Sequence, residues 1–268
     1  MKRKLRFTCF AVFLFFLLAA PVQGAEQGFN WKEVYNGVRY LRCEKIIEGK
    51  PVRFYAVSID LDLPGLIIAV SRPGKVFIRT SDFARETGAQ IAINGGFWDW
   101  ISKKPRGLWV SEGKKADSVE DNANRGFFAV SRNGVPWISP PGEAFVFSPE
   151  KEYMAVSGEP MVVRQGQPRE EGKIEYTRLK QPRSAIGIDK LGKSLFLVVS
   201  DGRQKESSSI SLMALGEFMA SIGVWDGLNI DGGGSSVLYI EKEGGVVNKP
   251  SDGRERKVLN CVTVSFGR

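Results

Sequence analysis

The chain has 268 residues, of which 43% are hydrophobic and 25% are charged. These proportions describe a globular domain with a substantial core and exclude a disordered or fibrous protein. The net charge of +8 falls by half without the four basic residues near the N-terminus, and no nucleic-acid-binding motif is present. We therefore expect no nucleic-acid partner.

The N-terminus has the layout of a secretory signal peptide. Basic residues within positions 2–6 precede an apolar run over residues 7–20, and small residues surround Gly24. This run is shorter than the roughly 20 residues that a spanning helix needs. We predict a signal peptide over residues 1–24 and a secreted, periplasmic or cell-envelope protein with no membrane anchor after cleavage. A retained anchor is the alternative.

Cysteine usage is compatible with export. Cys9 lies in the signal segment, which leaves Cys43 and Cys261 in the mature chain. Two cysteines in an oxidising compartment can form one disulfide, but they can equally be two buried free thiols. The sequence leaves both alternatives open.

Short segments rich in β-branched and aromatic residues recur along the mature chain, separated by turn residues. The predicted strands cover residues 38–47, 52–60, 66–71, 126–131, 184–189, 195–200, 237–240 and 258–266. Two helices are predicted, one over 81–87 that ends at Gly88 and one over 211–222 that ends at Gly223. We expect an α+β fold with a β-rich, mainly antiparallel core and few helices. Residues 25–84 should add N-terminal strands to the same single domain as residues 85–268.

The sequence contains no histidine, and this narrows its chemistry. Ser-His-Asp and Cys-His catalysis are excluded, as are histidine-based zinc sites. Proton transfer is left to carboxylates, Lys, Tyr or water, and an anion would be held by Arg, Lys or backbone amides. No segment has the ligand spacing of a calcium loop, so we expect no cofactor and no metal site.

Two glycine-rich turns follow short buried strands. The turn at 94–97, Asn-Gly-Gly-Phe, suits either close approach of a ligand or a plain hairpin. In the turn at 231–236, an Asp precedes three glycines and two serines, and successive backbone N–H groups there could form an anion-binding nest. Its spacing matches neither a P-loop nor a dinucleotide fingerprint. Trp98 can stack on a sugar face or pack in the core.

Two arginines lie at strand ends. Arg183 precedes the predicted strand 184–189, and Arg203 follows the strand 195–200. If the two strands pair as a hairpin, both arginines lie at the same end of it. A pair of guanidinium groups there matches the geometry of a phosphate.

Several motifs in order resemble the phosphodiester glycosidase family. They are Asn94-Gly95-Gly96-Phe97, Gly158-Glu159-Pro160, Arg183-Ser184-Ala185-Ile186-Gly187, Asp201-Gly202-Arg203, Asp231-Gly232-Gly233-Gly234-Ser235-Ser236 and the segment 248–256. The resemblance runs from about residue 85 to the C-terminus. It implies that these motifs converge on one pocket, which binds a carbohydrate phosphodiester.

This resemblance implies that the protein is an exported hydrolase of the glycosidic bond in a sugar-1-phosphodiester. The implied substrate is similar to an N-acetylglucosamine-1-phosphodiester or is part of an envelope polysaccharide or exopolysaccharide. The implied catalytic residues are Asp231 at the anomeric centre, with Glu159 and Asp201 as alternatives for a second acid or base. The implied substrate-binding residues are Asn94, Gly95, Gly96, Arg183, Arg203, Gly232, Gly233, Gly234, Ser235 and Ser236.

Two other functions stay open at this point. One is a non-catalytic module that binds a cell-envelope polysaccharide or a partner. The other is a metal-assisted phosphodiesterase that uses Asn94, Asp201 and Asp231 as oxygen ligands. Shared placement of Asp231, Arg183 and Arg203 in one pocket would favour the glycosidase.

Overall fold

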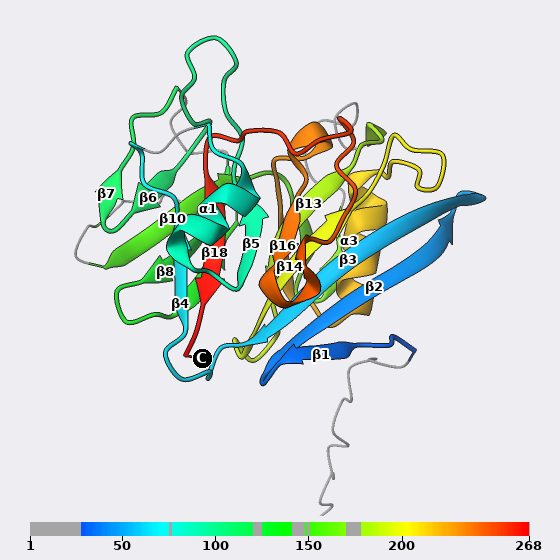
Figure 1. Ribbon diagram of the computed structural model, residues 1–268, viewed down its shortest axis with the longest axis horizontal. Coiled ribbons are helices and arrows are strands. Elements are labelled where there is room, and N and C mark those ends of the chain that lie inside the picture. Colours follow the sequence, from blue (N-terminus) through cyan, green and yellow to red (C-terminus); the bar gives the residue numbers. More distant parts are fainter. Residues whose placement is uncertain are drawn as a thin grey trace, which may run out of the picture.

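The computed structural model describes residues 28–74, 77–119, 125–140, 148, 151–169 and 178–267. The predicted signal segment lies outside these residues. The described part is an α+β domain built mainly from antiparallel strands, as the sequence predicts (Figure 1).

Three antiparallel sheets form the domain. The eight-stranded sheet contains, in spatial order, β1 (Lys32–Tyr35), β2 (Val38–Ile47), β3 (Lys50–Asp60), β14 (Ser194–Ser200), β13 (Arg183–Ile188), β15 (Asp226–Ile230), β11 (Met161–Arg164) and β12 (Gln167–Pro168). One five-stranded sheet contains β17 (Gly245–Val246), β16 (Leu238–Ile240), β5 (Ile91–Asn94), β18 (Cys261–Ser265) and β4 (Ile67–Val70). The other contains β7 (Lys114–Lys115), β6 (Trp109–Ser111), β10 (Glu152–Gly158), β8 (Gly126–Ser131) and β9 (Pro136–Ser139).

Among the described residues, two α-helices cover the outer faces of two of these sheets. Helix α3 (Leu212–Ser221) packs on the eight-stranded sheet beside β11 and β12, and Ser211 caps its N-terminus by accepting the N–H of Ala214. Helix α1 (Thr80–Thr87) packs on β5, β16 and β18, and ends at Gly88 in the left-handed conformation. Both predicted helices are confirmed to within one residue at each end. Two 3₁₀ turns, η2 (Gly233–Ser235) and η3 (Glu241–Glu243), flank β16.

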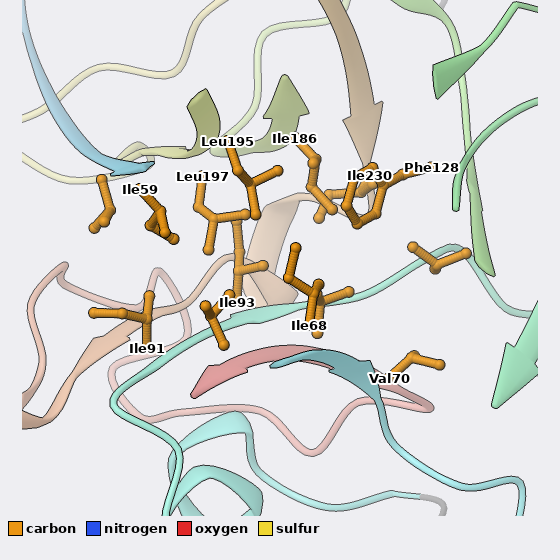
Figure 2. Packing of buried hydrophobic residues seen from close by; sticks show 14 of the residues in the cluster. Ile59, Ile68, Val70, Ile91, Ile93, Phe128, Ile186, Leu195, Leu197 and Ile230 are labelled. Atoms are coloured by element: carbon orange, nitrogen blue, oxygen red, sulfur yellow. The ribbon is translucent and has the colours of Figure 1, made fainter. Parts of the chain in front are cut away.

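The main core lies between the eight-stranded sheet and the sheet that contains β5. Figure 2 shows their inward-facing residues in contact across this layer: Ile59, Ile186, Leu195, Leu197 and Ile230 from the first sheet, and Ile68, Val70, Ile91 and Ile93 from the second. All nine are at most 4% exposed, so burial of this apolar layer is the dominant stabilising contribution. A second cluster joins α3 to the opposite face of the large sheet.

The predicted strand at 258–266 is shorter in the structure, where β18 begins at Cys261. Val258 forms an isolated bridge with Ile78, and the main chain and side chain of Asn260 bind the turn after β5. Cys43 and Cys261 are both free thiols and lie in different apolar clusters.

Candidate active site

Three adjacent central strands of the eight-stranded sheet, β14, β13 and β15, have termini at the same end of the sheet, which we call the site edge. Strand β13 begins at Arg183, which pairs with Ser200 at the end of β14, and Ser184 pairs with Ile230 at the end of β15. The predicted hairpin of 184–189 with 195–200 is therefore confirmed. Asp201 and Asp231 directly follow β14 and β15, so the antiparallel register brings both aspartates to the same edge.

Asn94 connects this edge to the neighbouring sheet. Its amide nitrogen donates to the main-chain oxygen of Asp231 at 2.6 Å, while its amide oxygen accepts the hydroxyl of Ser184 at 2.8 Å and the N–H of Val237 at 3.2 Å. The side chain is fully buried. Asn94 thus holds the backbone of the Asp231 turn, and its amide faces protein groups.

Gly95 and Gly96 allow the chain to approach Asn260 closely. Gly95 donates its N–H to the Asn260 main-chain oxygen, and Gly96 donates to the Asn260 Oδ1, both at 2.9 Å. A Cβ on Gly95 would collide with Asn260, and one on Gly96 would lie 2.6 Å from the Ser157 oxygen. The N–H of Asp231 donates to the Gly95 oxygen at 3.1 Å, so this turn supports the next one.

The glycine-rich turn after Asp231 lies between two arginines. Gly233 has φ +61°, and its missing side chain leaves the Arg203 guanidinium 3.3 Å from the Cβ position. At Gly234, a Cβ would collide with the guanidinium of Arg256. Only glycine permits both contacts. One of the predicted nest amides, that of Gly233, already donates to Pro182 at 2.9 Å.

Asp231 is the half-buried carboxylate of this turn. Burial raises its pKa to about 6, while Ser235, Arg256 and the N–H of Gly232 each act to lower the pKa. The Ser235 hydroxyl lies near the carboxylate without a hydrogen bond of regular geometry. In the described part of the chain, neither Ser235 nor Ser236 has a hydrogen-bond partner for its buried hydroxyl. Both hydroxyls therefore keep hydrogen-bonding capacity that these protein groups do not use.

Arg256 belongs to the 248–256 motif, but the sequence did not single it out. Its Nε and Nη2 donate to Oδ2 of Asp252 at 2.9 and 2.7 Å, and its guanidinium lies 5.5 Å from the centre of the Trp100 ring. The arginine is thereby held on both sides in a position that faces Gly234. It is the cation that acts on Asp231.

Arg183 and Arg203 share a strand end, as predicted, but their guanidinium groups have different surroundings. Arg203 is exposed and donates to Oε1 of Gln181 at 3.0 Å. Arg183 is only 2% exposed, and its guanidinium donates to the main-chain oxygens of Leu179 and Ile210. Of the two, Arg203 is accessible to a ligand.

Glu159 lies beside the strand that ends in Asp231. Its main-chain oxygen accepts the side-chain amide of Asn229 at 2.6 Å, and its N–H donates to the Asn229 oxygen at 2.8 Å. The carboxylate forms an ion pair with Arg125 at 2.8 Å. Arg125 also lies 5.8 Å from the ring centre of Phe97, which joins the 94–97 motif to this pair. Sequence analysis did not identify Arg125.

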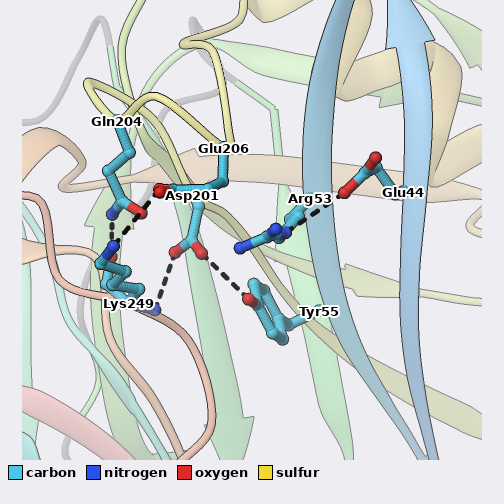
Figure 3. A network of polar contacts seen from close by, with 7 residues as sticks. All are labelled: Glu44, Arg53, Tyr55, Asp201, Gln204, Glu206 and Lys249. Atoms are coloured by element: carbon cyan, nitrogen blue, oxygen red, sulfur yellow. Dashed lines mark hydrogen bonds and ion pairs between the residues drawn. The ribbon is translucent and has the colours of Figure 1, made fainter.

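Asp201 accepts hydrogen bonds from several donors, and Figure 3 shows two of them, Tyr55 and Lys249. Its two oxygens accept the Tyr55 hydroxyl at 2.9 Å, the Asn248 amide at 3.3 Å and the Lys249 N–H at 3.0 Å. Burial raises the pKa of Asp201, although these hydrogen bonds act to lower the pKa. This carboxylate anchors the start of the 248–256 segment to the sheet. A nearby ion pair, Lys249 with Glu206 at 3.3 Å, lies at the surface.

Within the described residues, no group of three or more acidic or cysteine side chains is placed to hold a metal ion. None of the helices in that part of the chain has the length and hydropathy required to cross a bilayer.

Comparisons with known proteins identify the family of the chain. The sequence model of the phosphodiester glycosidase family matches residues 87–265, two thirds of the chain. The chain belongs to the phosphodiester glycosidase family. Its matched region contains every motif described above and the whole candidate site.

Bovine N-acetylglucosamine-1-phosphodiester alpha-N-acetylglucosaminidase is 28% identical over 193 residues, which cover 66% of this chain and 36% of the bovine protein. The chain thus spans about a third of the length of this relative. The catalytic domain of the zebrafish enzyme of that name, auto-inhibited by its pro-peptide, has a TM-score of 0.69 at 18% identity over 86% of this chain and 83% of the zebrafish chain. A hypothetical protein from Synechocystis has a TM-score of 0.64 at 15% identity, covering 88% of this chain and 63% of its own. The zebrafish and Synechocystis structures therefore have the same fold as this chain.

Proposed function

We propose that this protein is an exported hydrolase that cleaves the bond between the anomeric carbon of a sugar and a phosphodiester oxygen. The products are the free sugar and a phosphomonoester. Membership of the phosphodiester glycosidase family and the name of the bovine relative support this reaction class and an N-acetylglucosamine-1-phosphodiester as a first substrate. The signal-peptide pattern of residues 1–24 supports export.

The observation that carries the proposal is the Asp231 carboxylate at the start of the glycine-rich turn. Arg203 and Arg256 contact this turn at Gly233 and Gly234, and its two serine hydroxyls have no hydrogen-bond partner among the described residues. Cleavage at the anomeric carbon passes through an oxocarbenium-like transition state, which a nearby carboxylate stabilises. With a pKa near 6, Asp231 is mainly ionised at neutral pH. It then acts as the nucleophile or as the base that activates water.

The phosphate is held by Arg203 and Arg256 in this proposal, with Ser235 and Ser236 as hydroxyl donors. Both arginines contact the glycine-rich turn from outside. Arg183, whose guanidinium is bound to main-chain oxygens, braces the strand end instead of binding substrate. Phosphate departs with little help from a general acid, so electrostatic stabilisation of the leaving group is the main requirement.

Glu159 is our choice for a second acid or base. It is partly exposed and lies against Asn229, two residues before Asp231. Asp201 is less suited, because its oxygens accept three protein donors. Asn94, Gly95 and Gly96 set the position of the Asp231 backbone, and through it the position of the carboxylate.

The bond that breaks can be identified with oxygen-18. The purified protein is incubated with methyl N-acetylglucosamine-1-phosphate, a phosphodiester, in labelled water, and the products are followed by phosphorus NMR and mass spectrometry. We expect the label in the sugar, because the proposed attack is on carbon. Label in the phosphate would identify a phosphodiesterase, and binding without turnover would identify a recognition module.

A further inference from the structure

A second feature lies next to the candidate site and is unexplained by the cleavage of a small phosphodiester. It is a cavity of about 620 Å³ whose lining includes Trp98, Trp100, Lys103, Arg254, Arg256 and Lys257, which we call the basic groove. Arg256 belongs to both places, since one side of it faces Gly234 and the other side faces Trp100. The groove therefore continues directly from the turn that holds Asp231.

The floor of the groove is aromatic. Trp98 is buried. Its ring packs edge-on against Phe77, with 5.0 Å between ring centres, and lies tilted against Trp100, with 4.2 Å between ring centres. Trp100 itself is 60% exposed, and its neighbour Ile101 is 93% exposed. The buried ring thus supports an exposed one. Of the two roles that the sequence left open for Trp98, the structure shows packing in the core, and Trp100 is the ring exposed for stacking. An exposed indole is a common surface for a sugar ring.

The loop that carries Trp100 is ordered by its own hydrogen bonds. Asp99 accepts the N–H groups of Ile101 and Ser102 at 3.1 and 2.8 Å, and its other oxygen pairs with Arg106 at 2.8 Å. The bonds from Ser102 are the main cause of the lowering of the Asp99 pKa to about 2. Because the turn is held in place, the exposure of Trp100 is a fixed feature of the fold. Such pre-organisation reduces the entropy lost on binding.

The walls of the groove carry an excess of positive charge. Five cationic side chains and two carboxylates line it. Both carboxylates are engaged, since Asp252 binds Arg256, and Glu255 accepts the N–H and hydroxyl of Ser81 at 2.8 and 2.6 Å. In the described part of the chain, no carboxylate pairs with Arg254 or Lys257. These two cations can bind an anion from the ligand.

We infer that the basic groove binds the part of the substrate beyond the scissile phosphate, and that this part is a polyanionic glycan of repeated sugar-phosphate units. The inference rests on the proposed function for the position of the first phosphate. A sugar of the next unit stacks on Trp100, and the phosphate that follows it binds Arg254 and Lys257. A neutral aglycone would leave these cations unused.

The test compares a short and a long substrate. The purified protein is assayed with methyl N-acetylglucosamine-1-phosphate and with an oligomer of N-acetylglucosamine units joined by 1-phosphodiester bonds. We expect Trp100→Ala, and separately the double variant Arg254→Gln/Lys257→Gln, to lower the oligomer-to-methyl ratio of kcat/KM by about tenfold, mainly through the KM for the oligomer. Added salt should weaken oligomer cleavage by the unmodified protein more than by the double variant.

A matched control removes the same charge elsewhere. Lys114 and Lys115 are exposed on β7 and take no part in either site, so Lys114→Gln/Lys115→Gln should leave both kcat/KM values unchanged. Equilibrium binding of the oligomer to each variant, measured by calorimetry, separates the two proposals. If the methyl diester is cleaved and the ratio is the same in all variants, the groove inference is wrong while the proposed function stands.

Failure of the proposed function has a different signature. If no substrate is cleaved but oligomer binding weakens about tenfold in the groove variants alone, the groove inference stands without the enzyme. Absence of both cleavage and binding overturns both. Binding of phosphatidylglycerol vesicles that depends on Trp100, with no binding of the oligomer, would overturn the inference in favour of a membrane surface.

Discussion

Asp201 and Asp231 follow strands on either side of β13, and each is followed by a glycine, yet their surroundings differ. Asp201 is 1% exposed and accepts hydrogen bonds from Tyr55, Asn248 and Lys249. Asp231 is half-buried and lies near the Ser235 hydroxyl, which has no hydrogen-bond partner of regular geometry in the described part of the chain. One carboxylate has its acceptor capacity filled by protein, and the other keeps capacity for a ligand.

The comparison shows that a strand-end aspartate can stabilise the fold or serve chemistry, depending on the donors that reach it. Burial raises the pKa of both carboxyls, so the raised pKa alone does not separate them. The two carboxylates differ instead in how many protein hydrogen bonds they accept, three in the case of Asp201. A functional carboxylate is expected to be less well satisfied than a structural one, at a cost to stability.

The largest expected effect is on activity. Asp231→Asn should lower kcat/KM by at least about a thousandfold, because the amide can act neither as a nucleophile nor as a base. Asp226→Asn, on the strand that precedes Asp231, is the control, since among the described residues its side chain accepts only the N–H of Gln165, at 3.1 Å. Steady-state kinetics on the methyl diester measure both. Near-normal turnover by Asp231→Asn would remove the distinction between the two aspartates.

The second effect is on stability. Asp201→Ala leaves the buried Tyr55 hydroxyl, the Asn248 amide and the Lys249 N–H without their acceptor, so the free energy of unfolding should fall by about 3 kcal/mol. Tyr55→Phe removes one donor together with its hydrogen bond, so the free energy of unfolding should fall by only about 1 kcal/mol. Urea unfolding measures both changes. Activity per folded molecule should stay within a few-fold, and its complete loss in a stable Asp201→Ala protein would make Asp201 catalytic.

The difference between the two aspartates could not be predicted from the sequence, although much of the fold could. The helix over 211–222 was predictable because its apolar residues share one face and Ser211 caps it. By contrast, the strands Glu152–Gly158 and Met161–Arg164 were missed. Most residues of both strands are buried on both faces, so they lack the alternation of apolar and polar residues that identifies a strand.

For the site, the sequence placed the motifs at the correct strand ends but could not assign their side chains. Arg183 and Arg203 share an end, yet only the folded neighbours Leu179 and Ile210 reveal that the Arg183 guanidinium is occupied. Tyr55 reaches Asp201 across 146 positions of the chain. Contacts at such separation leave no local pattern, and for the same reason Arg125 and Arg256 were not identified.

The third effect concerns the cation beside Asp231. Arg256→Gln should raise the KM for the methyl diester about tenfold or more, because a charged donor to phosphate is lost. Since Arg256 acts to lower the pKa of Asp231, the acid limb of the kcat/KM profile should also move to higher pH. Arg72→Gln, which removes an exposed arginine paired with Glu112 at 2.6 Å, should change neither quantity. An unchanged profile in Arg256→Gln would place Arg256 outside the site.

The smallest effect links the chemistry of Asp231 to stability. Its pKa is about 6 in the folded protein, above the ordinary value of about 3.9 for an unfolded chain. Because the folded state binds this proton more tightly, the stabilisation is complete below the unfolded pKa and is lost as the pH rises through 6. Relative to Asp231→Asn, the free energy of unfolding should therefore fall by about 1 kcal/mol between pH 5 and pH 7.

Activity should change in the opposite direction over the same interval, since the proposed nucleophile or base works only when ionised. The kcat/KM of the unmodified protein should rise between pH 5 and pH 7 while its stability relative to Asp231→Asn falls. Asp201→Asn should leave the acid limb of the rate profile in place, because Asp201 takes no part in the proposed chemistry. Urea unfolding and initial rates at matched pH values measure the two trends. If both trends had the same sign, or if the limb disappeared in Asp201→Asn, the titrating carboxylate would not be Asp231.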